Sequence, residues 1–167
     1  MDSARQSGFS SRAAVEARSL GPEGITEILK HIPHRYPFLL VDRVIDCVPN
    51  QWVTVTKNVS SNDHFFAGVP MPQRQMPQML IVEALAQAAG ILCHFSGLLD
   101  GPVRPLMFLA GIEECTFGRA AVPGDQLQFD CRMNRVLRGI VKMTGIASVD
   151  GERVTDARLT AALRIVG

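Results

Sequence analysis

The sequence predicts an α+β domain in which one antiparallel sheet curls around a single long helix. Two observations lead to this prediction. A nearly uncharged apolar stretch covers residues 77–96, and seven strand-like segments flank it, two before it and five after it. A slender helix that is apolar on nearly all sides must be buried on most of them, so the sheet has to curve around it. Because one such layer leaves part of the helix uncovered, we also expect a homodimer.

The flanking elements follow from periodicity and turn residues. Residues 24–32 have the pattern of a short amphipathic helix, which Pro33 ends. Strands are predicted over residues 38–48, 52–59, 106–113, 114–119, 126–137, 140–149 and 153–166. Turn signals such as Asp150-Gly151 separate them. Residues 1–20 are expected to form a mobile or loosely docked arm, and residues 21–167 a single domain.

The long helix should begin at Pro77 and run to about Phe95 or Ser96, with Gly97 as the stop. Its length would also suit a membrane span. Glu83, Gln87 and His94 argue against a span, because polar groups are costly at depth in lipid. We therefore expect a buried helix of a soluble protein.

Glu83 is the most informative residue, because it is the only formal charge between Arg74 and Asp100. A lone carboxylate on an apolar helix needs specific partners or a shifted pKa. Gln87 and His94 lie within about 40° of it on the helical wheel, and Gln87 is the expected neighbour by the i,i+4 rule. This spacing fits a functional site, and it fits a polar seam at a subunit contact or water-filled crevice equally well.

The start of this helix is a second candidate feature. Met76 has no side-chain oxygen to cap the first turn, so the amides of Gln78, Met79 and Leu80 are expected to need other partners. Water could fill this role, and so could a ligand oxygen, since a helix N-terminus favours negative charge.

Composition excludes several function classes. The net charge of +1 and the sparse aromatic residues do not suggest a nucleic-acid surface. The four cysteines and four histidines have no metal-ligand spacing, so no metal site and no cofactor is predicted. Reduced core thiols are expected, as in a cytoplasmic protein.

Several segments together resemble the FabZ-like bacterial (3R)-hydroxyacyl-acyl-carrier-protein dehydratases of fatty acid synthesis, which have the hotdog fold. The similar segments lie between residues 23 and 165, and their order, spacing and character agree. They comprise residues 34–43, 57–59, 65–68, 76–77, 80–90, 122–125 and 138–139.

The resemblance implies a catalytic glutamate at Glu83 and a catalytic histidine fourteen residues before it. That second position is Val69, which cannot act as a base. The backbone N–H at Gln78 would polarise the thioester carbonyl. His64, five residues upstream of Val69, is the substitute candidate for the missing histidine. Substrate contacts are expected from Phe66, Gly68, Val69, Gln78, Met79 and Gln87.

Three functions follow from this resemblance. The first is a dehydratase or related lyase acting on 3-hydroxyacyl thioesters, impaired or rewired by Val69, with Glu83 as the acid if burial raises its pKa. The second is a hotdog thioesterase in which Glu83 directs water. The third is a non-catalytic acyl-chain-binding subunit. The expected partners are acyl carrier protein, docked on a basic rim drawn from Arg104, Arg119, Arg132 and Arg135, and further copies of the chain in a trimer of dimers.

Overall fold

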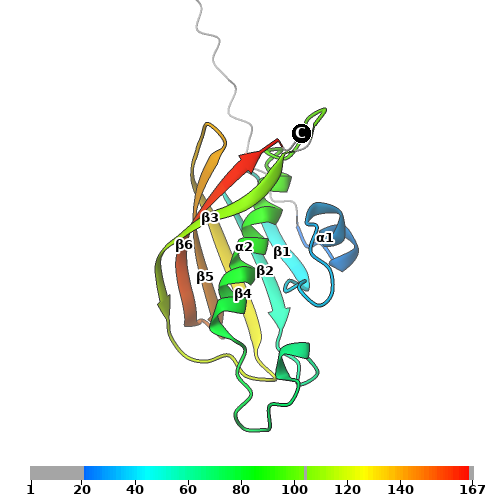
Figure 1. The fold of residues 1–167 in the computed structure, drawn as a ribbon, viewed down its shortest axis with the longest axis vertical. Helices are drawn as coiled ribbons and strands as arrows, with labels where there is room; N and C mark the ends of the chain where they lie inside the picture. Colours follow the sequence, from blue (N-terminus) through cyan, green and yellow to red (C-terminus); the bar gives the residue numbers. More distant parts are fainter. Residues whose placement is uncertain (1–20, 104, 166–167) are drawn as a thin grey trace, which may run out of the picture.

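The computed structural model describes residues 21–103 and 105–165. One six-stranded antiparallel sheet curves around a long helix, as predicted (Figure 1). The strands are β1 (Arg43–Val48), β2 (Trp52–Asn58), β3 (Leu106–Phe117), β4 (Gln126–Leu137), β5 (Ile140–Val149) and β6 (Glu152–Arg164). They lie in the order β1-β2-β4-β5-β6-β3, so β1 and β3 are the two edges. The predicted arm, residues 1–20, lies outside the described residues.

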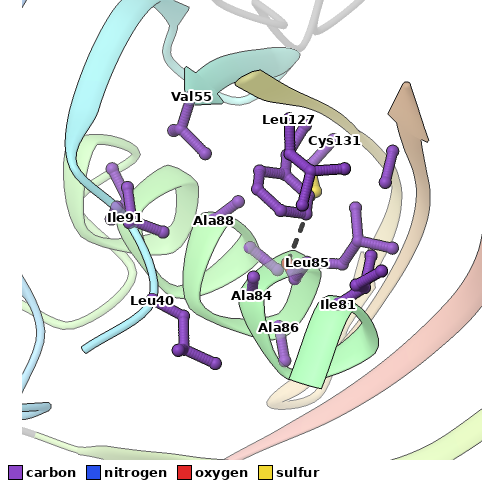
Figure 2. Close-up of a cluster of buried hydrophobic side chains, with 14 of the residues drawn as sticks. Leu40, Val55, Ile81, Ala84, Leu85, Ala86, Ala88, Ile91, Leu127 and Cys131 are labelled. Carbon is purple, nitrogen blue, oxygen red and sulfur yellow. Dashed lines mark hydrogen bonds between the residues drawn. The ribbon is translucent and has the colours of Figure 1, made fainter. Parts of the chain in front are cut away.

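Helix α2 (Gln78–Phe95) forms the centre of the core. Its small buried residues, including Ala84, Ala86 and Ala88, let neighbouring segments approach closely (Figure 2). On the strand side, Gly145 of β5 allows the closest approach. A Cβ at this position would lie only 2.9 Å from Leu85 Cδ2 of α2. By length and composition α2 could cross a membrane, but 67% of it is buried inside the fold. Helix α2 is therefore the buried core helix that Glu83, Gln87 and His94 predicted.

Three predicted boundaries were wrong. The strand expected from residue 38 begins at Arg43, because the segment before it bonds to α2 instead. The two strands expected over residues 106–119 are one strand, β3, in which an irregularity near Glu114 (φ 49°) absorbs the apparent break. Helix α2 begins at Gln78 with Pro77 as its cap residue, and the Leu80 amide donates to the Pro77 carbonyl at 2.9 Å.

The short helix α1 (Ile25–His31) packs beside β1 and α2, and its buried residue is Ile28. The chain then passes along α2 before it enters β1. Arg35 holds the turn after α1 by donating to the carbonyls of Leu29, Ile32 and His34. This turn decides where His34 points.

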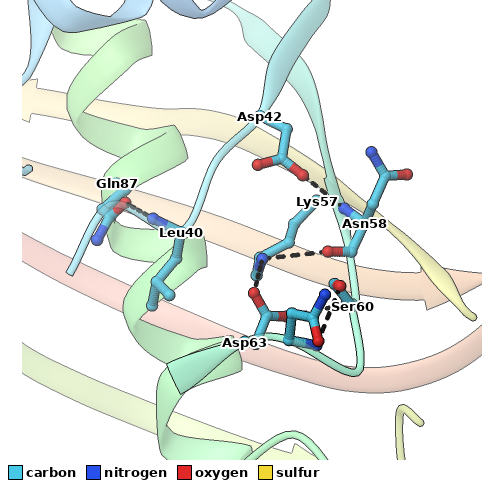
Figure 3. Close-up of polar contacts among 8 residues, drawn as sticks. Leu40, Asp42, Lys57, Asn58, Ser60, Asp63 and Gln87 are labelled. Carbon is cyan, nitrogen blue, oxygen red and sulfur yellow. Dashed lines mark hydrogen bonds and ion pairs between the residues drawn. The ribbon is translucent and has the colours of Figure 1, made fainter. Parts of the chain in front are cut away.

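The loop between β2 and α2 is fixed at several points. The buried Lys57 ammonium donates to the Asn58 carbonyl at 3.1 Å and lies 3.3 Å from Asp63 Oδ1 (Figure 3). The short helix η1 (His64–Phe66) follows Asp63 directly. Farther along, the Arg74 side chain donates to the carbonyls of Val69 and Ser61. The loop that carries Val69 is therefore held by side chains.

The four cysteines carry no disulfide, as expected from their spacing. Cys47, Cys93 and Cys131 are buried, and burial raises the pKa of each of these thiols to about 12. They are inert core residues.

Candidate functional site

Glu83 lies in a half-buried niche on α2, between the fully buried residues Val82 and Ala84. Its side chain is 23% exposed, so one edge of the carboxylate reaches solvent. The sequence predicted a lone carboxylate with specific partners, and the structure supplies two of them.

Gln87 is the first partner, as the i,i+4 spacing predicted. Its Nε2 donates to Glu83 Oε1 at 3.0 Å and to the Phe38 carbonyl at 2.7 Å. Its Oε1 accepts from the Leu40 amide at 2.9 Å, which Figure 3 draws as a dashed line. Gln87 is 1% exposed. One buried amide side chain therefore orients the carboxylate and fastens the segment before β1 to the helix.

His34 is the second partner, and it was not among the predicted site residues. Its Nε2 lies 3.3 Å from Glu83 Oε1, and its side chain is 30% exposed. It belongs to the motif that opens the family resemblance. Nothing in its spacing, however, shows that residues 49 positions apart meet. Only the path of the chain from α1 along α2 brings the imidazole to Glu83.

The partners determine the ionisation of Glu83. Burial is the largest influence and tends to raise the pKa of the carboxyl. The hydrogen bonds from His34 and Gln87 and the charge of His34 together outweigh it. The pKa of Glu83 therefore lies below its ordinary value of 4.5. The carboxyl is ionised at neutral pH, which suits a proton acceptor. The raised pKa that an acid role would require is not found.

The loop residues predicted to bind substrate form a second group. Phe66 is the buried residue of η1, Gly68 has a positive φ of 76°, and Val69 is half-buried. The Val69 amide donates to the Phe66 carbonyl at 3.0 Å. His64 is exposed, and its ring contacts Tyr36 and Phe65. No hydrogen bond or ion pair joins this loop to Glu83 within the described part of the chain.

Gln78 and Met79 are exposed in the first turn of α2. Their amides have no backbone acceptor among the described residues. Gln78 precedes Glu83 by five positions, so its side chain points about 140° away from Glu83 around the helix axis. Within one chain, the Glu83 niche and the exposed first turn of α2 therefore do not meet.

A cavity of about 200 Å³ opens beside the niche. His34 and Gln87, the two residues that contact Glu83, also belong to its wall. The rest of the wall is largely apolar and comes from α1, α2 and the start of β3. The ionised carboxylate therefore lies beside a largely apolar cavity, an arrangement common in small-molecule sites.

The described residues contain no group of three or more side chains suited to a metal ion.

Comparison with known proteins assigns the family. The model of the FabA-like domain matches residues 32–158. The chain belongs to the FabA-like family. The match includes His34, the loop at Val69, Glu83 and Gln87, so both parts of the candidate site lie within the FabA-like domain.

Curated relatives extend this assignment. The 3-hydroxyacyl-acyl-carrier-protein dehydratase FabZ of Shewanella pealeana is 45% identical over 89% of this chain and 97% of its own length. The protein of the same name from Aromatoleum aromaticum is 46% identical over 84% of this chain and 97% of its own. The resemblance seen in the sequence is therefore confirmed along most of the chain.

Solved structures confirm the fold. A chain of the dehydratase heterocomplex ApeI:P from Xenorhabdus doucetiae superimposes with a TM-score of 0.69 over 82% of this chain and 90% of its own, at 19% identity. The PaaI protein of E. coli superimposes with a TM-score of 0.56 over 71% of this chain and 80% of its own, at 12% identity. At these identities the likeness concerns the fold alone, and it confirms the hotdog architecture.

Proposed function

We propose that this protein is a 3-hydroxyacyl thioester dehydratase that acts on acyl-carrier-protein substrates. The observation that carries the proposal is the Glu83 carboxylate, which Gln87 and His34 orient through one oxygen beside an apolar cavity. The other oxygen, Oε2, has no partner among the described residues. The names of the curated relatives support the same reaction.

Dehydration requires a proton to leave carbon 2 and a hydroxyl to leave carbon 3 as water. We assign both transfers to Glu83 in turn. Its ionised Oε2 takes the carbon-2 proton, the electron pair forms the double bond as the carbon–oxygen bond breaks, and the same proton passes to the departing hydroxyl. Gln87 and His34 keep the carboxylate in place during both transfers.

Val69 is the reason that one carboxylate must do both tasks. The family's histidine at this position would supply the base, and loss of a general base typically costs ~10²–10⁴-fold in rate. We therefore expect slow turnover, with the Gln78 amide polarising the thioester carbonyl. His64 is retained as an alternative proton carrier.

The test is a parallel assay with crotonyl pantetheine, following loss of the enoyl absorbance and release of free thiol. Loss of absorbance without thiol is expected. Glu83→Gln should abolish this signal, whereas Glu23→Gln, which changes a carboxylate without contact to Glu83, should not. Unchanged turnover in Glu83→Gln would refute the assignment of this residue.

Three further variants identify the proton-transfer partner. Val69→His should raise the hydration rate if the loop presents the new imidazole to the substrate. His34→Leu should lower the rate at unchanged KM if His34 positions the carboxylate. His64→Leu should have no effect under this proposal, and a loss of rate there would move the role of proton carrier to His64.

A thioesterase is the second candidate, and the lowered pKa of Glu83 favours it, because an ionised carboxylate can direct water at a thioester. Release of thiol in the same assay would identify this reaction. Thioester binding without either signal would identify an acyl-chain-binding subunit.

The partners are proposed from charge and exposure. Arg132 and Arg135 are exposed on β4 and could contact an acidic carrier protein. Arg119 suits this role less well, since its guanidinium forms two hydrogen bonds with Asp125 at 3.1 Å. Arg104 lies outside the described residues. We also propose that the protein is cytoplasmic, as expected for an enzyme with the proposed acyl-carrier-protein substrates.

We propose that a homodimer completes the site. Strand β3 is an edge strand whose apolar residues, among them Leu106, Phe108 and Leu109, are 40–51% exposed. A second copy pairing with this edge would cover them. It would also allow the Val69 loop and Gln78 of one chain to meet Glu83 of the other. Three such dimers would make the hexamer that the resemblance implies, with residues 21–167 as one domain in each chain.

A further inference from the structure

The cavity beside Glu83 has polar groups at both ends. His34 and Gln87 lie where the cavity meets Glu83, at the near end, and His31, His94 and the exposed Lys30 line it farther along α2, at the far end. Gln87 and His94 are seven residues apart on α2, which separates them by about 10 Å along the helix axis. A chain that starts at Glu83 and follows this helix would therefore arrive at the two histidines.

The wall between the two ends is apolar. It includes Ile32, Ala86, Leu99 and Met107. Gly90 lets this wall come close to α2, because a Cβ at this position would lie only 3.3 Å from Met107 Cε and 3.5 Å from Ile32 Cγ2. An alkyl chain fits this middle section and gains by leaving water.

The two far histidines form a close pair. Their ring centroids are 4.1 Å apart at an interplanar angle of 32°, and Phe95 packs against the edge of His31 at 4.6 Å. The Nδ1 atom of His31 is buried, and it has no hydrogen-bond partner in the part of the chain that the structure describes. Buried polar atoms in native proteins nearly always have a partner, so this nitrogen calls for an explanation.

The charged groups around the pair determine what it can bind. Burial lowers the pKa of His31, His94 and Lys30 lower it further, and Glu27 acts in the opposite direction. His31 is therefore uncharged at neutral pH. A neutral imidazole presents one N–H donor and one nitrogen acceptor. A hydroxyl group also donates and accepts, so it matches such a pair better than a methyl group or a buried carboxylate does.

We propose that His31 and His94 form a specificity element that selects acyl chains carrying a hydroxyl group at the far end. This inference rests on the proposed function, because it assumes that the acyl chain of the substrate enters the cavity from the Glu83 niche. It adds a substrate class that neither the family nor the names of the relatives define.

Binding measurements test the inference without relying on turnover. Pantetheine thioesters of several chain lengths are prepared in pairs that differ only in a terminal methyl or a terminal hydroxyl. Their Kd values are measured by calorimetry on the full chain at pH 7.5. At the matching length we expect the hydroxyl chain to bind about five- to tenfold more tightly, the gain typical of one or two hydrogen bonds.

Variants assign the preference to the pair. His31→Leu and His94→Phe should each remove it, whereas His31→Gln, which keeps a donor and an acceptor, should retain most of it. Gln51→Leu, in the exposed turn between β1 and β2 and outside the cavity, is the control and should leave the preference unchanged. Equal affinity for both chains at every length would overturn the inference and leave the proposed function standing, as would a preference that persists in both His31→Leu and His94→Phe. Failure to bind any thioester would overturn both.

Discussion

Glu83 owes its acidity to neighbours that come from a distant part of the sequence. Its burial alone would raise the pKa of the carboxyl, and contacts from His34 and Gln87 reverse this effect. Since the folded pKa lies below 4.5, the ionised group stabilises the fold at pH values above 4.5. This stabilisation is lost as the pH falls through the lowered pKa.

The variant His34→Leu should raise the pKa of Glu83 above 4.5, because burial would then outweigh the remaining contact with Gln87. Carbon-detected NMR of the glutamate carboxyl groups during a pH titration measures this directly. Glu27, a half-buried carboxylate on α1 that pairs with Lys30 and not with Glu83, serves as the internal control in the same spectra. A pKa of Glu83 that stays below 4.5 in the variant would show that His34 does not govern it.

Gln87 should stabilise the fold as well as orient the Glu83 carboxylate. Gln87→Leu would leave the Leu40 amide and the Phe38 carbonyl without their partners. We expect the free energy of unfolding to fall by about 2–3 kcal/mol, measured by urea denaturation. The exposed Gln75 gives the control variant Gln75→Leu, which should change it by less than about 0.5 kcal/mol.

At the scale of elements, the sequence predicted what local patterns encode. The ends of β4 and β5 were predicted correctly, because the turns between them require positive φ and have suitable residues, with Arg138 at 49° and Gly139 at 76°. The break predicted between Glu113 and Glu114 was wrong, because β3 continues through them with a register irregularity at which Glu114 has a positive φ. Of the two contacts of Glu83, the sequence could predict only the one with Gln87, which is its neighbour on the same helix. The contact with His34 depends on tertiary packing.

The end of β3 offers a prediction about close backbone contact. A Cβ on Gly118 would lie 2.5 Å from the Arg153 carbonyl oxygen on β6, so Gly118→Ala should force the two strands apart. The expected loss is about 1–3 kcal/mol in the free energy of unfolding. Gly111→Ala within β3 is the control, because its Cβ would meet only Thr160 Cβ at 3.9 Å. Equal stability of the two variants would contradict the role assigned to Gly118.

At the scale of the whole molecule, the two sheet edges differ in what they present to solvent. Edge strand β3 exposes a row of apolar side chains, whereas β1 at the opposite edge exposes Ile45 together with Arg43. An uncovered apolar edge of this kind favours pairing with another chain, and the proposed homodimer would use it. The resemblance implied a dimer, and the sheet order now points to the strand that would form it.

Phe108→Glu on β3 should therefore weaken self-association by at least about tenfold in Kd, measured by analytical ultracentrifugation, because it would place a charge in the proposed interface. Ile45→Glu on β1 introduces the same charge at the other edge and should leave association unchanged. If the two variants dimerise equally well, the second copy does not pair along β3.

The link that Gln87 makes with residues 38 and 40 has a consequence for how activity appears during folding. Local interactions alone can form α2, but the carboxylate acquires its orientation only when a segment nearly fifty positions away closes onto the helix. In a refolding experiment, helical signal should therefore return before turnover does. The enzyme would become competent only at the last stage of chain assembly, when a distant stretch has docked.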